Sequence, residues 1–301
     1  MAENRFQVDD RLLLMHVYGG IGGKKSEFAP MRLFFGHFAY GLAQVIQDEL
    51  TQAPQFDLSY RQIYTHNTDG IISGSLDWTR YMGDRQFGWL GTRPVSDILI
   101  KFPPLTEDYD FDGVVFSPLT VLLRELDVMA ARYRIGDGTG TTFVSPVNSC
   151  VQDASQALYT ALQRMVAETK LTPLMVKWLR DHPDHPQTQR FAQLVSLVKT
   201  LERTLTPLGI VRADWQEQKT TLGGFPIETP MQTILFTLSS WRSLLPRLAN
   251  DLIVMVFLQL GATVWVLRTN QVGGHDPDIL PIAPTDFSSQ VPKIRQMRGL
   301  K

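Results

Sequence analysis

Two residues of types that catalyse hydrolysis occupy positions at which they could work together. The single cysteine, Cys150, lies in the run Asn148–Asp153 at the predicted start of a helix, and His37 opens an apolar run predicted to be a strand. A thiolate is a nucleophile, a helix N-terminus lowers the thiol pKa from about 8.5, and a neighbouring imidazole can take the proton. The pattern therefore predicts a thiol hydrolase.

The first turn of the predicted helix favours a charged sulfur. Ser149 and Gln152 match a capping box, with Ser at the N-cap and Gln three residues later. Cys150 would then be the first helical residue, at the positive end of the helix dipole. The free N–H groups of that turn could bind a developing oxyanion, so Ser149 and Gln152 are candidate supports of the site.

A third residue is expected to orient the His37 ring through its second nitrogen. Residues 56–66 alternate in polarity as a half-buried strand does, and residues 51–54 suit the hairpin loop before it. Pairing across this loop places residues 64–68 opposite His37. The candidates on the same strand face are His66, which we prefer, and the alternatives Tyr64 and Gln62.

Both principal residues also have an ordinary structural interpretation. Cysteine is among the most buried residue types, and Cys150 lies at the rim of the apolar stripe of its helix. A histidine in a strand can equally be a hydrogen-bonded core residue. The sequence therefore leaves a non-catalytic binding or scaffold protein as the alternative function.

Hydrophobic periodicity predicts the elements that would position these residues. The early part of the chain alternates with a period of two and the later part with a period near 3.6, so we predict an α+β fold with an antiparallel sheet packed on the Cys150 helix. Predicted strands lie at 11–18, 33–46, 56–66, 70–75, 76–82 and 95–102, and predicted helices at 117–134, 150–168, 173–181, 188–205, 231–248 and 251–268.

Four segments are predicted along the chain. They are an N-terminal segment at 1–30, an α+β domain at 31–170, a helical region at 171–270 and an extended tail at 271–301. The tail is assigned from its Pro, Asp and Ser content.

Composition narrows the functional classes. The chain has 301 residues, a net charge of −1 and an ordinary balance of 44% hydrophobic and 20% charged residues, so we expect no nucleic-acid partner. One cysteine excludes an internal disulfide, and the polar start carries no secretory signal pattern, which predicts a cytoplasmic protein. No motif with metal-ligand or phosphate-loop spacing is complete, so no metal and no cofactor are expected.

The run Leu252–Leu267 is almost entirely apolar. As a helix it would reach about 24 Å, which is short of the ~30 Å hydrocarbon core of a bilayer. We therefore expect a buried core helix here, and 231–268 is the region through which a peripheral membrane contact would be made.

The run Gly36–Gly41 resembles the His-bearing strand of permuted papain-like hydrolases, which include NlpC-related cell-wall peptidases and the lecithin retinol acyltransferase family. In these proteins the His precedes the Cys, a polar residue follows on the next strand, and the Cys opens a helix. His37, His66 or Tyr64, and Cys150 match these positions over roughly residues 31–168. The resemblance implies a cysteine peptidase, amidase or acyltransferase acting on a peptide, an amide or a lipid ester.

A second resemblance involves two short runs, Trp89–Pro94 and Asn148–Asp153. They look like a cyanobacterial and plastid family labelled predicted Abi or CAAX protease. The label implies an intramembrane enzyme that uses paired Glu, Arg and His residues. This chain has no Glu–Glu pair, and Glu125 and Arg132 lie on an ordinary amphipathic helix, so that mechanism is not expected here.

Overall fold

A computed structural model of the chain describes residues 6–19, 36–67, 70–77, 95–135, 150–205 and 246–269. Its main feature is a six-stranded antiparallel sheet in the order β4-β3-β2-β1-β5-β8. The strands are β1 (Arg11–Gly19), β2 (Gly36–Gln47), β3 (Pro54–Asn67), β4 (Gly70–Asp77), β5 (Val95–Lys101) and β8 (Thr263–Thr269). The predicted α+β class with an antiparallel sheet is confirmed.

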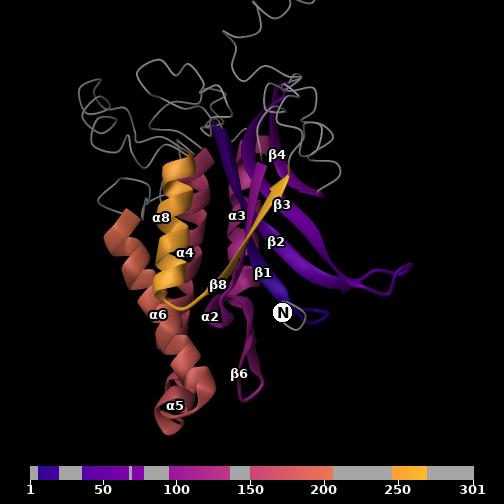
Figure 1. Cartoon of the computed structure of the whole chain (residues 1–301). Coiled ribbons are helices and arrows are strands. Elements are labelled where there is room, and N and C mark those ends of the chain that lie inside the picture. Colours follow the sequence, from indigo (N-terminus) through magenta and orange to yellow (C-terminus); the bar gives the residue numbers. More distant parts are fainter. Residues whose placement is uncertain are drawn as a thin grey trace, which may run out of the picture.

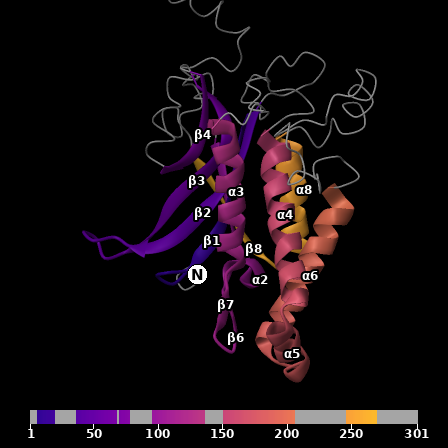
Figure 2. The ribbon, with the colours of Figure 1, turned by 180° about the vertical axis from the view of Figure 1, so that it is seen from behind.

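Helices cover one face of this sheet (Figures 1 and 2). α3, α4 and α8 contact the strands, whereas α6 packs against α4 and α8 as an outer layer. The helices are α2 (Pro103–Thr106), α3 (Pro118–Ile135), α4 (Cys150–Leu171), α5 (Pro173–Asp181), α6 (Pro186–Leu205) and α8 (Pro246–Gln259). A small hairpin of β6 (Tyr109–Phe111) and β7 (Val114–Phe116) extends below the sheet (Figure 2).

Strand β1 supplies side chains to two separate apolar clusters because successive residues point to opposite faces. Leu13 and Met15 join the large cluster beneath the helices, and Leu12 and Leu14 join a second cluster on the other face. Residues 12–17 are all fully buried. Both faces of the sheet centre are therefore interior.

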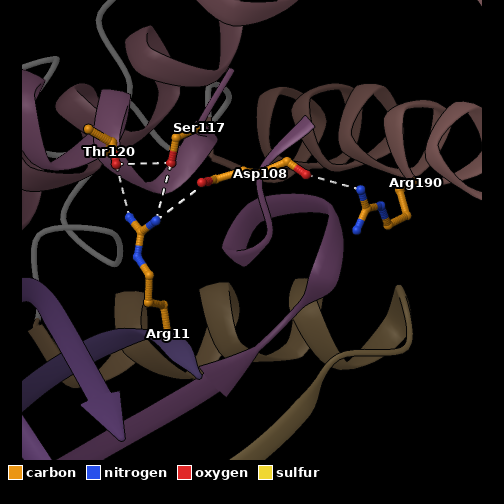
Figure 3. A network of polar contacts seen from close by, with 5 residues as sticks. All are labelled: Arg11, Asp108, Ser117, Thr120 and Arg190. Atoms are coloured by element: carbon orange, nitrogen blue, oxygen red, sulfur yellow. Dashed lines mark hydrogen bonds and ion pairs between the residues drawn. The ribbon is translucent and has the colours of Figure 1, made fainter. Parts of the chain in front are cut away.

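A polar network joins the start of β1 to the helix layer (Figure 3). The Arg11 guanidinium donates to Thr120 Oγ1 at 2.9 Å and to Ser117 Oγ at 3.4 Å, at the start of α3, and forms an ion pair with Asp108. Arg190 of α6 donates to the carbonyl oxygen of Asp108 at 3.1 Å. These contacts connect β1, the segment before β6, α3 and α6.

One helix predicted from the sequence is shorter in the structure, at the C-terminal end of the described chain. The helix predicted over 251–268 ends at Gln259, and the chain turns into strand β8. Gly261 has a φ of 87°, and the N–H groups of Gly261 and Ala262 donate to the carbonyls of Leu258 and Phe257, which is a Schellman end. Residues 263–266 are β-branched or aromatic and favour a strand.

The sheet also crosses the predicted segment boundaries. β1 comes from the predicted N-terminal segment 1–30, and β8 comes from the predicted helical region 171–270, yet both lie in the same sheet. Of the strand expected at 76–82, residues 76 and 77 belong to β4 and residues 78–82 lie outside the described residues. The helix expected over 231–248 lies outside the described residues up to 245. In the described part of the chain, none of the helices has the length and apolar character needed to cross a membrane.

Gly41 provides a test of the close approach between β2 and β3. A Cβ at this position would lie 2.2 Å from the Ser59 carbonyl oxygen, so Gly41→Ala should lower the free energy of unfolding by about 3 kcal/mol or more. Gly113 is the matched control, since it has a φ of +90° and open space around its Cβ position. Gly113→Ala should cost only about 1–2 kcal/mol. Denaturant unfolding measures both, and an equal loss would contradict the close approach of the two strands.

Candidate functional site

The Cys150 side chain is buried in the apolar cluster between the sheet and the helices. Its exposed fraction is 6%, and it belongs to the same cluster as Phe38 and Val151. Burial raises the pKa of the thiol from its ordinary 9.0 to about 12, and Asp153 adds to the rise, while hydrogen bonds with the backbone of Phe38 and Val151 oppose it. The thiol is therefore protonated at neutral pH.

His37 lies on the other face of the sheet. Phe38 and Tyr40 of β2 belong to the cluster beneath the helices, and Ala43 and Val45 belong to the opposite cluster. Strand alternation places His37 with Ala43 and Val45. Its Nε2 donates to Oε1 of Gln62 on the adjacent strand β3.

Strand alternation thus puts the side chains of Cys150 and His37, which are expected from the sequence to pair, on opposite faces of the sheet. The two residues are near each other along the fold, since the Cys150 thiol is hydrogen-bonded to the backbone of Phe38. Their side chains, however, are separated by the sheet. The physical reason is the period of two: a histidine next to a residue that faces the helices must face away from them.

The structure brings together one predicted pair, His37 and Gln62, the second being one of the alternatives for the third catalytic position. His66 and Tyr64 lie in β3, and Gln152 lies in α4, but their side chains are outside the described residues. Ser149 precedes α4 and is also outside the described residues.

A second histidine, which sequence reasoning missed, stands at the centre of the same sheet face. His16 of β1 donates from Nδ1 to Asp97 Oδ1 of β5 at 2.7 Å, and the Tyr60 hydroxyl donates to Asp97 Oδ2 at 2.7 Å. The rings of His16 and His37 are 6.3 Å apart. Together His16, His37, Tyr60, Gln62 and Asp97 form a polar cluster across four strands.

The polar cluster resembles an acid–base site in its chemistry but not in its exposure. An imidazole held by a carboxylate is the arrangement of a general base. Each of its five side chains is no more than 3% exposed, and buried polar groups of this kind are ordinarily hydrogen-bonded core residues. No group of His, Cys, Asp and Glu that could hold a metal ion occurs among the described residues.

Glu125, the acidic residue considered with the Abi label, has a structural partner. It is almost fully buried on α3, and its Oε1 accepts a hydrogen bond from Arg164 of α4 at 2.8 Å. Arg164 also pairs with Glu168 on its own helix. The glutamate therefore joins α3 to α4.

Comparison with known proteins adds no relative. The chain matches no protein-family model, no curated protein and no solved structure. The function must therefore be argued from the geometry.

Asp97 is the residue whose replacement should most disturb the polar cluster. Asp97→Ala removes the acceptor of both His16 and Tyr60 and should lower the free energy of unfolding by about 3–5 kcal/mol. Asp127 is the matched control, because it also forms an ion pair, with Arg61, but its side chain is half exposed. Asp127→Ala should cost at most about 1 kcal/mol. Similar losses in urea denaturation would show that the Asp97 contacts are weak.

The raised pKa of Cys150 predicts a pH dependence of stability. Above the ordinary pKa of 9.0 the unfolded chain loses the thiol proton while the folded chain keeps it up to about 12. Stability is therefore complete below pH 9 and should fall by about 1.4 kcal/mol per pH unit above it. The difference between wild type and Cys150→Ala, measured by denaturation from pH 7 to pH 10, isolates this slope. Parallel profiles would contradict the burial of the thiol.

Proposed function

We propose that this protein is a non-catalytic binding or scaffold protein in which Cys150 is a residue of the core. The observation that carries the proposal is the location of the Cys150 sulfur, in an apolar cluster with the thiol pKa raised to about 12. A nucleophilic cysteine needs access and a lowered pKa. The nearest predicted base, His37, is engaged with Gln62 on the opposite face of the sheet.

A binding role also suits the distribution of exposed apolar side chains. Large apolar residues are exposed on α8 and on the strand that follows it, namely Met255, Leu258, Val266 and Leu267. Other large apolar side chains are exposed on α5 and on the β6–β7 hairpin, among them Leu174, Val176 and Val115. Apolar side chains that remain in water are available for contact with a partner.

A second candidate is a cysteine peptidase, amidase or acyltransferase of permuted papain-like fold. It is favoured by the position of Cys150 as the first residue of the 22-residue helix α4, where the helix dipole stabilises a thiolate. The His37–Gln62 contact supplies an oriented imidazole on the neighbouring strands. This function requires the His37 ring to reach the helix-covered face and the sulfur to become accessible to a peptide, amide or lipid ester.

Alkylation of Cys150 with iodoacetamide separates the two functions. Because burial holds the thiol protonated, the native protein at pH 8 should react at least about 100-fold more slowly than the protein unfolded in guanidinium. Mass spectrometry measures the labelled fraction, and Cys150→Ala is the unlabelled control.

An activated thiol would give the opposite result. Native protein would then react faster than free cysteine at pH 6–7, and His37→Gln would slow it, while Asp127→Ala would not. That outcome would overturn the binding proposal in favour of the thiol enzyme.

A further inference from the structure

We draw no further inference here: the strongest candidate, the exposed apolar side chains on the surface of α8 and β8, carries none because nothing in the part of the chain that the structure describes shows what covers them.

Discussion

The fold depends on the burial of β1 from both sides. Residues 12–17 are fully buried between β2 and β5, with alternate side chains in two apolar clusters. A strand in this position cannot carry an unpaired polar side chain, since an unsatisfied buried polar group costs about 1–3 kcal/mol. His16 is the one polar side chain among residues 12–17, and its burial requires a hydrogen-bond partner. Asp97 of β5 is that partner, and Asp97 also accepts a hydrogen bond from Tyr60 of β3.

This constraint explains why the second sheet face is partly polar and still buried. The Asp97 carboxylate accepts hydrogen bonds from two strands that are not its neighbours in the chain, so it specifies the order of β3, β1 and β5 more closely than apolar contacts could. The adjacent His37–Gln62 contact does the same for β2 and β3. A one-residue slip turns every side chain of a strand to the other face, so the buried carboxylate would lose both of its donors. The polar cluster thus fixes the register of the strands in the sheet.

The sequence was sufficient for elements whose hydrophobic period matches one buried face. The alternation of 56–66 predicted β3, and the stripe from Leu119 to Met129 predicted α3. The run 252–267 failed because it is apolar in nearly every position, and such a run has no period that distinguishes helix from strand. Gly261 followed by Val264 and Val266 was the available signal. The His16–Asp97 contact joins residues 81 positions apart, and no local spacing could reveal it.

The reactivity of Cys150 could not be predicted from its position in the sequence. Cys150 does begin a helix, and a helix N-terminus stabilises a charge by about 0.3–1 kcal/mol, or ~2 kcal/mol in favourable geometry. Full burial acts in the opposite direction by up to about 3–5 pKa units, and one unit corresponds to about 1.36 kcal/mol. Desolvation therefore exceeds the dipole, and the thiol pKa rises. The position of a cysteine along a helix can be predicted from spacing, but its burial depends on β2 and the helix layer packing over it, and that tertiary term decides whether the sulfur is a nucleophile or part of the core.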